Sequence, residues 1–431
     1  MKTAAAVLIG IAMTTTLDAA ETLRQSLDRA VRDAEARMIE IRRDLHQHPE
    51  LGNREVRTAK VVEARLRELG IEVTTGVAHT GVVGVLRGGK PGKVVALRAD
   101  MDALPVTEEV DLPFASKVRT TYNGQEVGVM HACGHDAHTA ILLAAAEALA
   151  KVKGQLSGTV KFIFQPAEEG PPAGEEGGAE LMVKEGVLEN PKVDAVFGLH
   201  VGSRVASGEI AYRPEGMMAA VDSFEVVVHG KQTHGAYPWL GVDPIVVASQ
   251  IVLGLQTIAS RQLDSTVAPA IVTVGVIRGG VRNNIIPDKV ELIGTIRSLD
   301  ATMREDIHAR IRRTAENIAS AAGAKATVTI TRGYPITFND PALTAASVPT
   351  LQRVAGRDKV LVANASLGAE DFSFYQQKVP GLFFWLGTRP DGQTAEEAAS
   401  NHSPKFEVNE SGMLLGARAL ANLAVDFLVG K

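Results

Sequence analysis

One nine-residue stretch, residues 130–138, concentrates side chains that could bind a metal ion. It contains the only cysteine of the 431-residue chain. Its candidate ligands are Cys133, His131, His135 and His138. A thiolate and imidazoles are ligands that zinc-class metals prefer, and Gly134 lets the chain turn so that Cys133 and His135 can face one point. A buried structural cysteine beside loop histidines is the alternative, but the clustering favours a metal site.

Three apolar segments must position the partners of this stretch. They are typical of strands buried on both faces of a sheet, and they cover residues 93–99, 158–164 and 193–199. Each leads into polar residues, which are Asp100 and Asp102, Glu168 and Glu169, and His200. Open α/β sheets place their sites at the carboxyl ends of the strands. We therefore expect these side chains to meet at one edge of a sheet, close to the cysteine loop.

Glu168 and Glu169 are adjacent carboxylates that follow a strand and a proline, so they cannot point the same way. One can bind metal while the other faces a substrate water, as metal-assisted hydrolysis requires. A solvated acidic turn is the alternative, and it is how we interpret Glu175 and Glu176. His46 and His48 also resemble ligands, but they lie at the end of a predicted helix (residues 21–46), where histidine suits the helix dipole.

Composition limits the class of protein. Hydrophobic residues make up 45% and charged residues 22% of the chain, as in ordinary globular proteins. A net charge of -5 without a basic run gives no reason to expect nucleic acid or a membrane as partner. Residues 1–20 resemble a secretory signal peptide, which predicts export to the periplasm or the medium. No later stretch looks long and apolar enough to span a membrane.

The predicted elements define an α/β protein with two domains. The catalytic domain, residues 21–212 and 332–431, has a mostly parallel central sheet flanked by helices, and a helix is expected to begin at residues 367–372. Residues 213–331 have the order β-α-β-β-α-β of a small ferredoxin-like domain. Two of its loops carry His234 and Asn284, which could stabilise an oxyanion or could only cap the loops.

The order of these motifs resembles the metal-dependent amidohydrolases of metallopeptidase clan MH, in the branch of hippurate, N-acyl-amino-acid and auxin-conjugate hydrolases. The motifs occupy residues 42–46, 49–50, 100–105, 131–136, 166–170, 198–200, 230–238, 284–288, 294–297, 368–372 and 402–404. The match covers nearly all of the chain after residue 20. Two departures are Asp100, where the wider clan has histidine, and a longer loop after Glu169.

The resemblance implies a site with two divalent metals, zinc or manganese first, with cobalt or nickel not excluded. The implied ligands are Cys133, His135, Glu169, His200 and His402. It also implies Glu168 as general base, Asp102 as the carboxylate that orients a ligand, and His234 as a residue that reaches the reaction intermediate. The implied substrate-binding residues are Asn284, Arg297 and Gly368. The ferredoxin-like domain would be a lid that forms a homodimer.

We therefore expect a hydrolase that cleaves the amide of an N-acyl amino acid or a small peptide-like conjugate. An exopeptidase acting on free peptides is the nearest alternative. An exported solute-binding protein, or a metal-storage or structural protein, would not need a base beside a metal ligand, and the paired glutamates argue against both.

Overall fold

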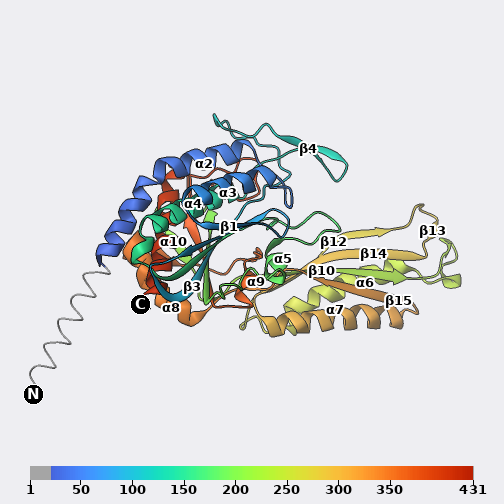
Figure 1. Ribbon diagram of the computed structural model, residues 1–431. Helices are drawn as coiled ribbons and strands as arrows, with labels where there is room; N and C mark the ends of the chain where they lie inside the picture. The colour runs from blue at the N-terminus through green and yellow to red at the C-terminus, as the bar shows by residue number, and fades with distance from the viewer. Residues whose placement is uncertain (1–20, 431) are drawn as a thin grey trace, which may run out of the picture. The chain divides into compact units, whose positions relative to one another are not determined.

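The computed structural model describes residues 21–430 (Figure 1), and the predicted signal peptide lies outside the described residues. The chain forms two compact units. Unit 1 contains the chain up to Pro214, Asn339–Ala363 and the chain from Phe374 onward. Unit 2 contains Glu215–Phe338 and Asn364–Ser373.

An eight-stranded sheet forms the centre of unit 1, in the order β1-β2-β6-β3-β7-β18-β8-β17. Its middle strands β6, β3, β7 and β18 run parallel to one another, and antiparallel pairs flank them. The strands are β1 (Glu72–Val77), β2 (Gly81–Arg87), β3 (Lys90–Asp100), β6 (Ser157–Gln165), β7 (Ala195–Gly202), β8 (Ile210–Tyr212), β17 (Val360–Val362) and β18 (Gly381–Gly387). The predicted α/β class with a mostly parallel central sheet is confirmed.

Helices cover this sheet, and two of them consist mostly of apolar residues. Helix α4 (His135–Lys151) and helix α10 (Met413–Leu428) pack against each other and against β3 and β7. Other helices of unit 1 are α2 (Glu35–Gln47), α3 (Val56–Glu68), α5 (Gly178–Lys184), α8 (Pro341–Ala355) and α9 (Ser373–Gln376). Residues 21–33 are also helical.

The last helix corrects the expectation that no segment after residue 20 is long and apolar enough to span a membrane. The segment Glu410–Leu428 is long and apolar enough to cross a membrane, yet 78% of its apolar window is buried. Its side chains, Leu420 and Leu423 among them, belong to the core of unit 1. Apolarity here reflects a helix buried on nearly all sides.

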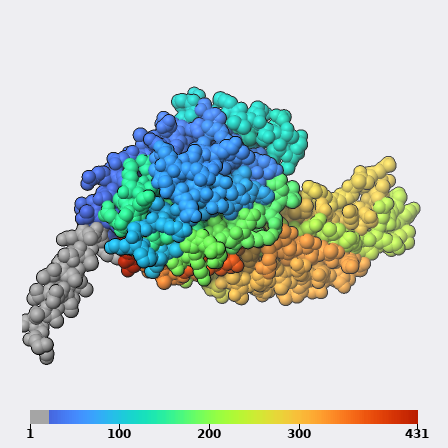
Figure 2. Space-filling model, viewed as in Figure 1, coloured from blue at the N-terminus to red at the C-terminus, as the bar shows by residue number. Residues whose placement is uncertain are grey.

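Two short strands, β4 (Arg119–Tyr122) and β5 (Gln125–Gly128), form a hairpin that was not predicted. The segment around residue 120, teal in Figure 2, lies at the surface of unit 1. Its residues are mostly polar and exposed, which explains why no apolar pattern marked it.

Unit 2 is an antiparallel sheet of order β12-β14-β10-β15 with two helices, α6 and α7, packed on its strands. Its elements are β10 (Ala220–His229), α6 (Pro244–Thr257), β12 (Ala270–Gly279), β14 (Lys289–Ser298), α7 (Ala301–Ala321) and β15 (Lys325–Arg332). This is the predicted β-α-β-β-α-β order. Short pieces complete it: β9 (Glu215–Met218), β11 (Thr233–His234), β13 (Ile285–Ile286) and β16 (Thr337–Asn339).

The structure differs from the predicted domain boundaries and from the helix expected at residues 367–372. Unit 2 extends to Phe338 and includes Asn364–Ser373, which was assigned to the catalytic domain. The backbone N–H of Ala219 donates to the carbonyls of both Ser366 and Gly368. These carbonyls therefore bind a neighbouring segment rather than the next helical turn, and the segment has no helix before Ser373.

Candidate metal centre

The cysteine loop meets helix α4 at a position that only glycine can occupy without strain. Gly134 precedes the helix with φ at 93°, and a side-chain Cβ there would lie 2.3 Å from a methyl group of Val201. His135 is the first residue of α4. The tight turn therefore brings Cys133 and His135 to the same side, as the sequence predicted.

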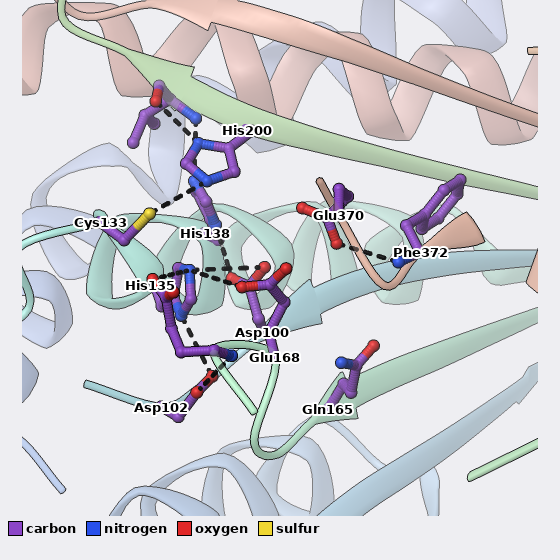
Figure 3. A network of polar contacts seen from close by, with 12 residues as sticks. Asp100, Asp102, Cys133, His135, His138, Gln165, Glu168, His200, Glu370 and Phe372 are labelled. Atoms are coloured by element: carbon purple, nitrogen blue, oxygen red, sulfur yellow. Dashed lines mark hydrogen bonds and ion pairs between the residues drawn. The ribbon is translucent and has the colours of Figure 1, made fainter. Parts of the chain in front are cut away.

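All five predicted ligands belong to unit 1, and their donor atoms converge. The Sγ of Cys133 lies 3.3 Å from Nε2 of His200, and Nε2 of His402 lies 3.0 Å from Oε1 of Glu169. Ligand atoms of Cys133, His135 and His200 all lie within 4.8 Å of one another, and so do those of Cys133, Glu169 and His402. Cys133 is common to both groups. Figure 3 shows the contact between Cys133 and His200, with His135 nearby beside the carboxylates.

The ring nitrogens are oriented as metal ligands would be. Nδ1 of His200 donates to the carbonyl of Val201 at 2.8 Å, so its Nε2 faces Cys133 with a lone pair. His135 contacts Asp102 through Nδ1, and its Nε2 has no hydrogen-bond partner among residues 21–430. Oxygens of Asp100, Glu168 and Glu169 lie 3.8 to 4.0 Å from this nitrogen, too far for hydrogen bonds. A buried imidazole nitrogen without a hydrogen-bond partner, beside carboxylates and a thiol, fits a bound cation.

Asp102 connects two of these ligands. One of its oxygens lies 3.2 Å from Nδ1 of His135, and the other accepts the backbone N–H of Glu169 at 3.0 Å. Its side chain is buried, so these contacts are not exchanged with water. These contacts fit the orienting role that the family resemblance implies for Asp102, which stays a prediction.

The electrostatics of the cluster favour a cation. Burial, reinforced by the negative charges of Glu169 and Glu168, raises the pKa of Cys133 well above its usual value. Burial opposes the charged form of His135, but Asp100 and Asp102 outweigh it and raise its pKa to about 10. Both shifts reflect carboxylates close to these two groups, and a divalent cation bound there would offset their negative charge.

Asp100 is not a solvent-facing ligand, although it ends strand β3. Its carboxylate pairs with Arg98 at 2.6 Å and with Nδ1 of His138 at 2.6 Å. Nε2 of His138 in turn accepts the N–H of Val201 at 2.8 Å, and the ring lies 4.6 Å from that of His200. This series of contacts, from Arg98 through Asp100 and His138 to Val201, supports the strand that carries His200. The sequence feature that could have indicated this contact is the position of His138, three residues after His135 and on the same face of the helix.

His402 reaches the cluster through a loop rather than from a strand end. Its backbone has φ at 72°, and its N–H donates to the carbonyl of Ala132 at 2.8 Å. The side-chain amide of Asn401 donates to the carbonyls of Cys133 and Val201. These bonds hold the loop of His402 beside the cysteine loop, a role for Asn401 that sequence reasoning missed.

The structure overturns the interpretation of His46 as a simple helix-end histidine. His46 is buried, with Nδ1 2.8 Å from Asp136 and Nε2 3.0 Å from Glu108. Asp136 also pairs with Arg42 at 2.9 Å. The network thus supports the first turn of α4 immediately after His135. His48 is exposed and contacts only the end of its own helix, as expected.

The remaining predicted residues belong to unit 2. His234 is exposed in β11, and its Nδ1 accepts the N–H of Ala236 at 3.0 Å. The carbonyl of Asn284 accepts the N–H of Gly235 at 2.8 Å, so these two loops are paired. Arg297 is half-buried in β14, where burial lowers its pKa, and Gly368 lies in the exposed segment beside Ala219.

A buried thiol, histidines and carboxylates at the carboxyl edge of a mostly parallel sheet define a metal-dependent hydrolase with a second, ferredoxin-like unit. Comparison with known proteins agrees. Peptidase family M20/M25/M40 matches residues 96–426, and the chain belongs to this family.

Individual relatives indicate the type of bond that members of this family cleave. The chain is 45% identical to thermostable carboxypeptidase 1 of Saccharolobus solfataricus, over 94% of this chain and 99% of that protein. It is 38% identical to an N-acetylcysteine deacetylase of Bacillus subtilis, over 91% and 97%. The crystal structure of a dinuclear metal-binding M20 peptidase from Bacillus subtilis matches with a TM-score of 0.77 and 37% identity, over 92% and 99%. The protein is a metal-dependent amidohydrolase with a site for two divalent metals.

Proposed function

We propose that the protein hydrolyses the amide bond of N-acyl amino acids, with Glu168 as general base and Cys133, His135, Glu169, His200 and His402 as metal ligands. The observation that carries the proposal is the division of the paired glutamates. Oxygens of both glutamates lie close to Nε2 of His135, at 3.9 Å for Glu168 and 4.0 Å for Glu169, but Glu169 also pairs with His402 at 3.0 Å.

Divalent cations held by these side chains supply Lewis acidity, which polarises a carbonyl oxygen and lowers the pKa of water. The chain supplies the proton transfers. Glu168 is 5% exposed, so its carboxylate faces the cluster rather than bulk water. It accepts a proton from the attacking water and delivers it to the leaving amine. Asp102 holds His135 and the Glu169 backbone in place throughout. His234, Asn284, Arg297 and Gly368 are proposed to contact the substrate.

The test is release of free amino acid from a panel of N-acyl amino acids and unblocked dipeptides by metal-loaded protein. Release from the N-acyl compounds is the expected result, and Glu168→Gln provides the blank. Release only from dipeptides would replace this proposal with an exopeptidase, which the similarity to a carboxypeptidase makes the second candidate. No release from either set would contradict both.

We propose zinc or manganese as the metals. A thiolate and imidazoles favour zinc, while the carboxylates also suit manganese. Metal analysis of protein purified without added metal, followed by reconstitution with each ion singly, decides between them. A fully active enzyme with neither ion would contradict this assignment.

We propose that unit 2 forms a homodimer through the edge of its sheet. Strand β12 ends the sheet order, and it exposes Ile271 and Ile277 at 38% and 55%. Leu253 of α6 is 71% exposed. An exposed apolar edge strand is a template for pairing with a second copy. Sedimentation should give a dimer, and Ile277→Lys with Leu253→Asp should give a monomer. A monomeric wild-type protein would contradict the proposal.

We also propose that the protein is exported and that residues 1–20 are removed. The short apolar run after Lys2 motivates this. N-terminal sequencing of protein recovered from the periplasm or the medium should begin near Glu21. Intact protein starting at Met1 and retained in the cytoplasm would contradict it.

A further inference from the structure

Glu55 is a fully buried carboxyl group outside the predicted site. It immediately precedes helix α3, and its side chain does not cap that helix. Glu50 caps it instead, because its two oxygens accept the N–H groups of Arg57 and Thr58 at 2.9 and 2.8 Å. The Glu55 side chain is therefore directed elsewhere. The hydroxyl of Thr80 donates to Oε2, and the backbone N–H of Ala167 donates to Oε1 at 2.8 Å.

Ala167 is the residue directly before Glu168, and its backbone has an uncommon conformation. Its φ is 51°, which a residue with a side chain rarely adopts unless its surroundings impose it. Gly52, in the same loop as Glu55, lies so close that a Cβ there would be 3.1 Å from the Cβ of Ala167. The loop before α3 therefore packs against the turn at Ala167, and the Glu55 side chain accepts a hydrogen bond from the backbone of that turn.

We propose that Glu55 is a positioning residue for the general base: its hydrogen bond to Ala167 holds the turn that directs the Glu168 carboxylate into the metal centre. This inference rests on the proposed role of Glu168. Glu55 does not touch the predicted ligands and takes no part in proton transfer.

The turn has two anchors, and they act on different residues. Glu55 holds the N–H of Ala167, next to Glu168, whereas Asp102 accepts the N–H of Glu169. Loss of the Glu55 contact should therefore displace the base and leave the metal ligand in place. Small displacements are costly, since about 1 Å of misplacement can reduce a rate by ~10²-fold.

Glutamine is the matched conservative variant. Its carbonyl oxygen can accept from Ala167, and its amide can donate to the Thr80 oxygen. Burial, reinforced by the charge of Asp102, raises the pKa of Glu55 to about 8, so an uncharged side chain suits this position near neutral pH. Thr80→Val is the second control, because it removes the other partner of Glu55 and leaves the Ala167 contact.

The experiment compares Glu55→Ala, Glu55→Gln and Thr80→Val with wild type for kcat, KM and metal content. Hydrogen exchange of the segment 165–170 is measured on the metal-free proteins. We expect Glu55→Ala to lower kcat by about 10- to 100-fold with KM and metal content nearly unchanged, and to speed exchange in this segment. Glu55→Gln and Thr80→Val should stay within about threefold of wild type.

The proposal is overturned by wild-type kcat in Glu55→Ala, by unchanged exchange in the segment, or by an equal loss of kcat in Glu55→Gln. Loss of metal from Glu55→Ala would also overturn it, because it would place the defect at Glu169. Failure of the base assignment is a separate outcome, since it appears as retained activity in Glu168→Gln while wild type is active.

Discussion

Glu168→Gln should lower kcat for amide hydrolysis by ~10²- to 10⁴-fold, the range typical of a positioned general base. The amide side chain has nearly the same shape but cannot accept a proton from water. Metal content should stay at the wild-type value, because the predicted ligand of the pair is Glu169, which contacts His402. Steady-state kinetics with metal analysis on the same preparation measures both.

Glu175→Gln is the matched control on the same loop. The side chain of Glu175 pairs with Arg54 at the surface, and hydrogen bonds from Arg54 and Asn53 lower its pKa to about 2. Its removal should leave kcat within about twofold of wild type, as for most surface substitutions. A Glu168→Gln enzyme as active as this control would remove Glu168 from the mechanism.

Cys133→Ala should abolish activity by a different route, through loss of metal. Its Sγ lies within 4.8 Å of the other ligand atoms in both convergent groups, so one substitution removes a donor from each. Wild-type protein should hold about two ions per chain, and the variant about one or fewer. Substitution of residues that only support ligands already costs about 10- to 100-fold in metal affinity, and loss of a ligand should cost more. Metal analysis after dialysis measures this.

The control for Cys133→Ala is thermal unfolding of metal-free wild type and metal-free variant. Because alanine removes only a buried thiol, the two metal-free proteins should unfold at similar temperatures, while added metal should stabilise wild type more than the variant. Full metal occupancy in the variant would contradict the assignment of Cys133 as a ligand. A large difference between the metal-free proteins would instead mean that the thiol is needed for folding.

The sequence by itself determined the fold class and supplied the candidate residues of the site, whose roles stay predictions. Strands that are buried on both faces of a sheet are recognisable as apolar runs in the sequence. The polar residues that follow each run can then be identified from the sequence alone. Asp102 and Glu169 were recognisable in this way. The sequence pattern of unit 2 likewise predicted its β-α-β-β-α-β order, and in β10 the side chains alternate between buried and more exposed positions as an alternating strand requires.

Only the tertiary structure decided which groups hold these components in place. His46 contacts Asp136 across 90 residues, and Glu55 contacts Ala167 across 112 residues. No local pattern encodes such pairs, since each depends on two distant segments packing against the same core. The segment 364–373 shows the same limit: its backbone bonds to a neighbouring segment of unit 2, and these bonds override its local tendency to form a helix.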